Sequence, residues 1–584
     1  MPFRWVFATP DKKNSVDELT RQLNIPDQIA QLLSLRGIDT FDKAQGFFRP
    51  GIDGLHDPFL MKDMKPAAQR LCKAIRNCET VMVYGDYDVD GTTATSIVYT
   101  FLKSFGLNVE YYIPHRFKEG YGINPDGIRH AIEIEADLIV SVDCGITAIE
   151  ETEFATQNGI DLIICDHHNV GDELPKAVAV LDPKRPDCPY PFDGLSGAGV
   201  GFKLVQATIT ELGLSSTLAY KYLDLVAISI ASDIVPMVDE NRILMREGLS
   251  MINSNPRVGI RELLRRIKIP IGTITTSSIV FSIGPRINAA GRMGDAATAV
   301  ELMISTDESA ASKHAKELES INLKRRSTDS RTMEEAVEQI ESDFNMDELS
   351  SMVLHDPDWH LGVIGIVASR LVDAYYRPAI MLSTVEGKIK GSARSIKGFN
   401  IYEALKKCDD LLEQFGGHEF AAGLTMDASN LEEFRERIDQ IAFRYLKEND
   451  FSPEIIIDQK LDLQHVNMRF WKLLSQFEPF GPGNLRPIFV SENICVEGVP
   501  SIVGNGHLKM KISQDNSGVF DAIGFNMHEY MPRLINCSDN KIDVAYVLEE
   551  NFWNGKRSLQ MRLKDIHIEK REEEMPEEVE NDMG

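Results

Sequence analysis

Three aspartates within five positions give the strongest chemical signal in this chain. Asp86, Asp88 and Asp90 follow the apolar, β-prone run Val81–Tyr84 and precede a glycine. Three carboxylates that shared a dry site would repel one another strongly, so a positive charge must lie among them. Carboxylate oxygens are hard ligands that suit Mg²⁺ or Mn²⁺. The stretch therefore predicts a buried strand that ends at a divalent-metal site.

The same residues also match the start of a calcium-binding helix–loop–helix, D-x-D-x-D-G. That loop needs a bidentate glutamate at its twelfth position, which is Ile97 here, and a helix in front, where this chain has a strand pattern. The calcium interpretation fails on both counts. A solvated acidic turn is the remaining alternative, and the other candidate ligands argue against it.

Further candidate ligands follow later apolar runs: Asp143 in SVDCGIT, Asp166, His167 and His168 in IICDHHN, and Asp233 in LVAISIASDIVPM. An acid after a strand is often a helix N-cap, so each is weak evidence by itself. Taken together they predict strand-end sites of a hydrolytic centre, where two divalent ions convert water to hydroxide and hold a phosphoryl group. No G-x-S-x-G nucleophile motif competes with this interpretation.

Strand patterns alternate with helix patterns from about residue 56 to 250. The expected strands are 81–84, 109–113, 138–142, 162–165 and 178–181. This alternation predicts an α/β domain with a parallel sheet covered by helices, and such sheets gather ligands at the carboxyl ends of their strands. The candidate ligands lie in the sequence where that rule places them.

GDYDVDG, SVDCG, CDHH and ASDIVPM, in this order, resemble the motifs of the DHH phosphoesterase family. The resemblance implies the metal ligands Asp86, Asp88, Asp90, Asp143, His167, His168 and Asp233. It makes Asp143 the bridge between the ions and, with His167 and His168, a catalytic residue. Asp166 would orient a histidine rather than bind metal. Which aspartate of the first cluster stays outside the inner shell is left open.

Two segments contain arginines that could contact phosphate. IPHRFKEGYGIN places Arg116 and Tyr121 just after an expected strand, with a solvated loop as the alternative. GPRINAAGRMGD interleaves Arg286 and Arg292 with glycines and small residues, which let a backbone approach closely. Both segments are therefore candidates for nucleic-acid contact.

Two more candidate segments lie farther along the chain. KIKGSARSIKGFN contains Ser392 and Arg394, a hydroxyl and a guanidinium suited to gripping a terminal phosphate. His418 lies in FGGHEFAAG, where the alternative to a binding role is a structural histidine in the core. GGHEFAAG resembles the signature of the second, substrate-binding domain of the family, termed DHHA1. The resemblance favours a binding role for His418.

The length of 584 residues allows roughly three to five domains. We expect an α/β multidomain protein with this order: an N-terminal helical segment at 1–55, a parallel-sheet DHH domain at 56–250, a helical connector at 251–345, a smaller α/β DHHA1 domain at 346–450, an OB-like β-barrel at 451–570 and an acidic disordered tail at 571–584. Short β-rich pieces broken by Gly, Asn and Asp predict the barrel, a common single-strand binder. Its aromatic candidates include Trp553.

The net charge of −27 argues against generic electrostatic attachment to nucleic acid, although a local basic groove is compatible with it. No apolar run approaches the roughly 20 residues that cross a bilayer. The N-terminus also lacks a signal peptide's apolar stretch, so we expect a cytoplasmic protein with no membrane partner. Eight cysteines without a CxxC pair predict reduced thiols.

From about residue 50 to 570 the chain resembles the branch of the DHH family that degrades single-stranded DNA. The resemblance implies a metal-dependent exonuclease that digests single-stranded DNA from the 5′ end to mononucleotides, in DNA repair and recombination, with two Mn²⁺ or Mg²⁺ ions. Arg116, Ser392 and Arg394 would hold the 5′ terminus, while Arg286 and Arg292 would line the strand's path. A helicase or a single-strand-binding protein is a candidate partner.

Three alternatives remain. A DHH phosphodiesterase that acts on oligoribonucleotides or cyclic dinucleotides would typically be shorter and lack the barrel. An inorganic pyrophosphatase is disfavoured by the length of the chain and by its DNA-suited arginines. A non-catalytic replication scaffold is disfavoured because every expected ligand is present.

Overall fold

The structure is a computed structural model that describes residues 3–9, 13–343, 345, 349–446, 451–515, 517–535, 541–553 and 556–568. It divides into two compact units. Unit 1 combines residues 1–49, 452–478 and 485–584, and unit 2 combines 50–451 and 479–484. The predicted acidic tail and the side chain of Trp553 lie outside the described residues.

Unit 2 contains the predicted parallel sheet. Its strand order is β3-β2-β4-β5-β6, and every neighbouring pair is parallel. The strands are β2 (Val81–Tyr84), β3 (Val109–Tyr112), β4 (Leu138–Val142), β5 (Asp161–Cys165) and β6 (Ala179–Leu181). The carboxyl ends of these strands therefore meet along one edge of the sheet.

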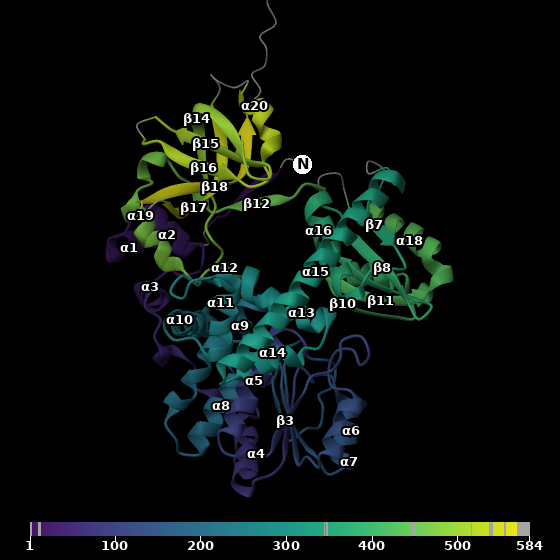
Figure 1. Cartoon of the computed structure of the whole chain (residues 1–584). Coiled ribbons are helices and arrows are strands. Elements are labelled where there is room, and N and C mark those ends of the chain that lie inside the picture. The colour runs from purple at the N-terminus through teal and green to yellow at the C-terminus, as the bar shows by residue number, and fades with distance from the viewer. Residues whose placement is uncertain are drawn as a thin grey trace, which may run out of the picture. The chain divides into compact units, whose positions relative to one another are not determined.

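Alternating side chains of this sheet enter two separate cores. Val81 and Val83 pack into one hydrophobic cluster, whereas Met82 and Tyr84 pack into another. The first cluster contains side chains of α4 (Met64–Asn77), α5 (Val89–Lys103) and α8 (Gly197–Glu211). The second contains side chains of α6 (Pro125–Glu133) and α7 (Ile149–Gln157). Figure 1 shows these two helical layers on either side of the sheet.

The middle of unit 2 is helical, as the sequence predicts for the connector. Its main helices are α9 (Leu223–Ser232), α10 (Asp239–Ser254), α11 (Val258–Ile267), α13 (Gly284–Met293), α14 (Ala297–Ile304) and α15 (Glu308–Asp343). α15 is 36 residues long and packs against α11, α13, α14 and α16 (Leu361–Tyr375). This long charged helix is therefore an integral part of the unit.

A second sheet in unit 2 forms the smaller α/β domain, with the strand order β10-β11-β9-β8-β7. Its strands are β7 (Met352–His355), β8 (Ala379–Val385), β9 (Lys388–Arg394), β10 (Gln414–His418) and β11 (Ala421–Asp427). Only the β7–β8 pair is parallel. α16 packs on one face of the sheet and α18 (Leu431–Tyr445) on the other (Figure 1).

Unit 1 contains a β-barrel, which confirms the OB-like prediction. Its main strands are β14 (Phe489–Val503), β15 (His507–Ser513), β16 (Phe520–Gly524), β17 (Ile542–Trp553) and β18 (Lys556–Ile568). They run in the order β14-β15-β16-β18-β17, and pairing of β14 with β17 closes the sheet on itself. Closure leaves no long unpaired edge among these strands.

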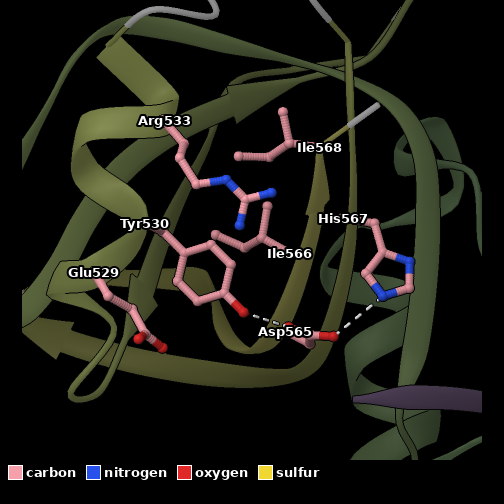
Figure 2. Close-up of a pocket in the computed structure, with 7 residues that line it drawn as sticks. All are labelled: Glu529, Tyr530, Arg533, Asp565, Ile566, His567 and Ile568. Atoms are coloured by element: carbon pink, nitrogen blue, oxygen red, sulfur yellow. Dashed lines mark hydrogen bonds and ion pairs between the residues drawn. The ribbon is translucent and has the colours of Figure 1, made fainter. Parts of the chain in front are cut away.

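The N-terminal segment belongs to this barrel unit. β1 (Arg4–Phe7) pairs in parallel with β12 (Glu454–Ile457). The Trp5 ring stacks on His567 with centroids 3.7 Å apart, and its Nε1 donates to Asp565 Oδ2 at 2.8 Å. Figure 2 shows the same buried Asp565 accepting from the Tyr530 hydroxyl at 2.7 Å. These contacts tie the start of the chain to the last strand of the barrel.

Among the helices of the described residues, none combines the length and the apolar composition needed to span a bilayer.

Candidate active site

The seven predicted metal ligands converge at the carboxyl edge of the parallel sheet. His167 Nε2 lies 3.2 Å from Asp143 Oδ1, and 3.6 Å from both Asp90 Oδ2 and Asp233 Oδ2. Ligand atoms lie within 4.8 Å of one another in three groups: Asp143, His167 and His168; Asp90, His167 and Asp233; and Asp86, Asp88 and Asp143. Residues that are distant in the sequence thus form one centre.

Asp233 reaches this centre from a helix, so the prediction that it follows a strand is wrong. LVAISIAS forms most of α9, and Asp233 is the residue at its C-terminal end. All but the last residue of α9 are buried. A run that is buried on every side carries no periodicity that separates a helix from a strand, which is why the sequence misled.

Unsatisfied buried atoms show that the centre fits divalent cations. Among the described side chains, Asp86 Oδ1, Asp143 Oδ1 and His167 Nε2 are buried without a hydrogen-bond partner. Burial, and then the neighbouring carboxylates Asp90, Asp88 and Asp86, raise the pKa of Asp143 well above its ordinary value. Free lone pairs and uncompensated negative charge in one place are what bound Mn²⁺ or Mg²⁺ would satisfy.

The backbone at Asp143 adopts a conformation that L-residues rarely take, with φ at 62°. Its amide donates to the Cys165 carbonyl at 2.8 Å, which ties the turn after β4 to the end of β5. Gly197 packs directly against this side chain, since a Cβ there would lie 2.6 Å from Asp143 Oδ1. The glycine therefore lets the start of α8 approach the centre.

Asp90 is held by donors from two helices. It accepts hydrogen bonds from the amides of Gly197 and Ala198, at 2.7 and 2.8 Å, at the positive N-terminal end of α8. Ser229 of α9 donates to it at 2.7 Å. Sequence reasoning missed Gly197 and Ser229, because a donor contributed by a distant helix leaves no local pattern.

Both histidines have their rings fixed by hydrogen bonds. His167 Nδ1 lies 3.0 Å from the Leu195 carbonyl oxygen and donates to it, which leaves Nε2 facing the carboxylates. His168 Nδ1 lies 2.7 Å from Asp166 Oδ1. Burial opposes the charge on His168, but Asp166 raises the pKa of the ring to about 9.

Asp166 has the geometry of the predicted orienting residue. It also accepts from the amides of Ile146 and His167 at 2.8 and 2.7 Å. Burial alone would raise the pKa of Asp166, but these hydrogen bonds and the one from His168 lower it below its ordinary value. A carboxylate occupied by so many donors is suited to holding an imidazole rather than a metal ion.

A cavity of about 790 Å³ in unit 2 collects most of the predicted phosphate-contacting residues. Its lining includes Tyr87, Arg116, Arg292, Ser392, Arg394 and His418. The Arg116 guanidinium lies 4.9 Å from the centre of the Tyr87 ring, and Arg394 Nη1 donates to Ser392 Oγ at 3.0 Å. Tyr87 stands between Asp86 and Asp88 in the chain, so the cavity borders the metal centre.

The cavity gathers three positively charged side chains. Within the described part of the chain, Arg116, Arg292 and Arg394 make no ion pair with a carboxylate. Burial, and then the neighbouring Arg116 and Arg394, lower the pKa of Arg292 to about 10. Clustered guanidiniums beside a hydroxyl suit a phosphate group that carries two negative charges.

Arg286 lies apart from this cavity lining. Its guanidinium forms an ion pair with Glu319 of α15 and donates to the Ser282 carbonyl at 2.6 Å. Its expected contact with the strand therefore stays a prediction.

Three family models match the chain. "DHH family, N-terminal domain" matches residues 80–230, "DHHA1 domain" matches 345–442 and "RecJ OB domain" matches 457–565. The matched ranges overlap the predicted DHH, DHHA1 and barrel segments.

Several curated relatives are similar to nearly the whole chain, and each is described as a single-stranded-DNA-specific exonuclease RecJ. The Bacillus subtilis protein is 39% identical over 97% of this chain and 71% of its own length. The Dickeya dadantii protein is 32% identical over 94% of this chain and 98% of its own length. The Escherichia coli protein is 32% identical over 95% of this chain and 98% of its own.

Solved structures agree with these relatives. RecJ from Thermus thermophilus in complex with Mn²⁺ superposes with a TM-score of 0.82 at 29% identity, over 97% of this chain and 79% of that one. An exonuclease RecJ bound to manganese has a TM-score of 0.59 at 35% identity, over 66% of this chain and 96% of that one.

Proposed function

This chain belongs to the RecJ family of single-stranded-DNA-specific exonucleases and is a metal-dependent exonuclease of single-stranded DNA, and we propose that it digests the strand from its 5′ end. The observation that carries this polarity is the cavity beside the metal centre, whose three arginines form no ion pair with a carboxylate of the described residues. A 5′-phosphorylated terminus carries two negative charges, whereas a 3′-hydroxyl terminus is neutral. Only the former gains from such a cluster.

The adjacency of cavity and metal centre supports release of mononucleotides. Tyr87 lines the cavity, and its chain neighbours Asp86 and Asp88 are predicted ligands. A terminal phosphate bound by Arg116 and Arg394 would therefore bring the next phosphate of the strand to the metal centre. Successive cuts at that position yield one nucleotide at a time.

We propose that the ions are held by two groups of side chains that share the bridging Asp143. One group is Asp86, Asp88 and Asp143, and the other adds Asp90, His167, His168 and Asp233. Bound there, two divalent ions would supply an activated water and offset the charge that develops on the phosphorus. The protein keeps Asp90 and His167 in place through the α8 amides and the Leu195 carbonyl.

End-labelled DNA tests the polarity. With Mn²⁺, a 5′ label on single-stranded DNA should be released at once as a mononucleotide, while a 3′ label stays in fragments that shorten gradually. Release of the 3′ label first would contradict the proposal. Parallel reactions with duplex DNA and with RNA of the same sequence show which class of nucleic acid the enzyme degrades.

The variant Arg394→Ala tests the phosphate-binding role of the cavity. Loss of a hydrogen bond to a charged group is worth about 1.5–3 kcal/mol, so kcat/KM should fall about 10- to 100-fold on 5′-phosphorylated DNA. The same variant should change little on 5′-hydroxyl DNA. The control is Arg129→Ala, an exposed arginine of α6. An unchanged preference for 5′-phosphate would place end recognition elsewhere.

We further propose a role in DNA repair and recombination in the cytoplasm, with a helicase or a single-strand-binding protein as partner. An enzyme that needs an unpaired strand depends on a reaction that separates duplex DNA. Adding a helicase and ATP should therefore make a blunt duplex degradable. A duplex that stays intact under active unwinding would argue against this coupling.

A further inference from the structure

The loop between β3 and α6 reaches both the cavity and the metal centre. Arg116, near its start, lines the cavity and lies over the Tyr87 ring. Tyr121, five positions later, lies against His168, with ring centroids 5.5 Å apart. One short segment therefore spans the two parts of the site.

The Tyr121 hydroxyl touches two predicted metal ligands. It lies 3.0 Å from His168 Nδ1 and donates to the Asp143 carbonyl oxygen at 3.3 Å. Asp166 accepts from the same His168 nitrogen, so the phenol and the carboxylate together fix the ring. The phenol also supports the backbone of Asp143, whose left-handed conformation needs outside support.

The backbone around Tyr121 is built for this placement. Gly120 and Gly122 flank it with φ values of 85° and 87°, a conformation that favours glycine. The Gly122 carbonyl accepts from the Tyr84 hydroxyl at 3.0 Å, and Asn124 donates to that hydroxyl at 2.9 Å. The end of the loop is thereby fastened to β2, the strand that leads into the aspartate cluster.

The beginning of the loop is equally constrained. The His115 amide donates to Glu119 Oε2 at 2.6 Å, and the Glu119 amide donates back to the His115 carbonyl at 2.9 Å. Phe117 packs edge-on against His360 at the start of α16, with centroids 5.9 Å apart. Because these contacts hold the loop at both ends, we expect a displacement of Arg116 to displace Tyr121 as well.

We propose that Tyr121 is a positioning residue that couples occupancy of the arginine cavity to the metal centre. Its hydroxyl sets the His168 ring and the Asp143 backbone, and a phosphate bound to Arg116 stabilises the loop that carries it. The coupling rests on the proposed 5′-phosphate site. The effect on metal binding does not depend on which DNA end is attacked.

Tyr121→Phe tests the positioning role, because it removes the hydroxyl and keeps the ring. Outer-shell partners of metal ligands typically change metal affinity or activity about 10- to 100-fold. Calorimetric titration of the DNA-free protein should show Mn²⁺ binding about tenfold weaker, and kcat on 5′-phosphorylated DNA should fall at least about tenfold with KM within about twofold. The control Tyr99→Phe, on α5, should match the wild type, and equal melting temperatures establish that all variants are folded. Mn²⁺ affinity and kcat that both stay within about twofold of the wild type would overturn the positioning role.

The double variant Arg116→Ala/Tyr121→Phe tests the coupling. If the loop joins the two sites, the loss of kcat in the double variant should be clearly smaller than the product of the two single losses. A loss equal to that product would overturn the coupling. If the labelling experiment shows 3′ polarity while Tyr121→Phe still weakens Mn²⁺ binding, the polarity proposal fails and the positioning role stands.

Discussion

Asp143 combines features that are costly without a bound cation. Its carboxylate is buried, its Oδ1 has no hydrogen-bond partner among the described residues, and its backbone φ is 62°. Such strain and uncompensated charge persist only where the surrounding structure enforces them, and they are common at functional sites. These features lower the stability of the metal-free protein, and they fit the proposed bridging role of Asp143.

Replacing Asp143 by Asn should separate stability from function. The neutral amide removes a buried charge, so the free energy of unfolding in EDTA should rise by about 1–3 kcal/mol. The melting temperature should rise with it. If Asp143 is shared by the two ions as proposed, Mn²⁺ binding and cleavage should both fall at least about 100-fold. Calorimetry and a nuclease assay measure the two effects. The exposed Asp172→Asn serves as control, and wild-type Mn²⁺ affinity in Asp143→Asn would contradict the bridging role.

Asp182, just after β6, predicts a pH dependence of stability. It is fully buried, and burial raises its pKa to about 7 from an ordinary value of 3.8. The folded state therefore favours the protonated carboxyl. Its contribution to the free energy of unfolding is fully present below about pH 4 and is lost as the pH rises through 7. Asp182→Asn should raise unfolding free energy at pH 8 by up to a few kcal/mol and have little effect at pH 4. Chemical denaturation in EDTA at both pH values measures the difference, and an equal effect at both would contradict the shifted pKa.

At the scale of elements, the sequence predicted the sheet well because parallel strands obey a simple rule. An apolar run followed within two residues by Asp correctly located the ends of β2, β4 and β5. The rule failed for α9, whose apolar residues are buried on all sides. It also could not supply Ser229 or the α8 amides, because their role depends on how distant helices pack.

α13 acts as a support for the aspartate cluster. Asn288 Oδ1 accepts from the Val89 amide at 3.1 Å, and a Cβ at Gly291 would collide with the Tyr87 carbonyl oxygen. The helix therefore lies directly behind the turn that carries Asp86, Asp88 and Asp90. A change of helix position would move the ligands.

Gly291→Ala should test this support. Overpacking at a tight contact costs about 1–3 kcal/mol, and the displaced turn should also lower kcat. Gly46→Ala is the matched control, because Gly46 is exposed on α3 (Phe41–Phe48) with open space around it. That change should stabilise the protein by about 0.5–1 kcal/mol. Thermal melting measures the stability of both variants, and steady-state kinetics measures their kcat. A wild-type melting temperature and kcat for Gly291→Ala would show that α13 does not constrain the turn.

At the scale of the whole molecule, the net charge of −27 gives no indication of the arginine-lined cavity. Composition argued only against generic electrostatic attachment to nucleic acid and left a local basic groove open, and three guanidiniums from distant segments gather in one cavity. The motif resemblance supplied what composition could not. The resemblance did not predict that residues 1–49 group with the barrel, because nothing in the sequence of β1 indicates that it pairs with β12.

Trp5→Ala should test that grouping. The substitution removes the stack on His567 and the hydrogen bond to buried Asp565. Leaving a buried acceptor short of a donor costs about 1–3 kcal/mol, so the unfolding transition of unit 1 should move to lower temperature. Scanning calorimetry measures it, with the exposed Phe7→Ala as control. An unmoved transition would show that the N-terminal strand contributes no stability to the barrel unit.

The pairing of β1 with β12 joins residues 450 positions apart, and this sets an order of events on the ribosome. At about 5–20 residues per second, the first strand waits roughly 20 to 90 s for its partner to be synthesised. Residues 50–451 emerge during that delay as one continuous stretch. Most of the nuclease core can therefore fold while β1 is still unpaired, so β1 is open to a chaperone throughout that delay.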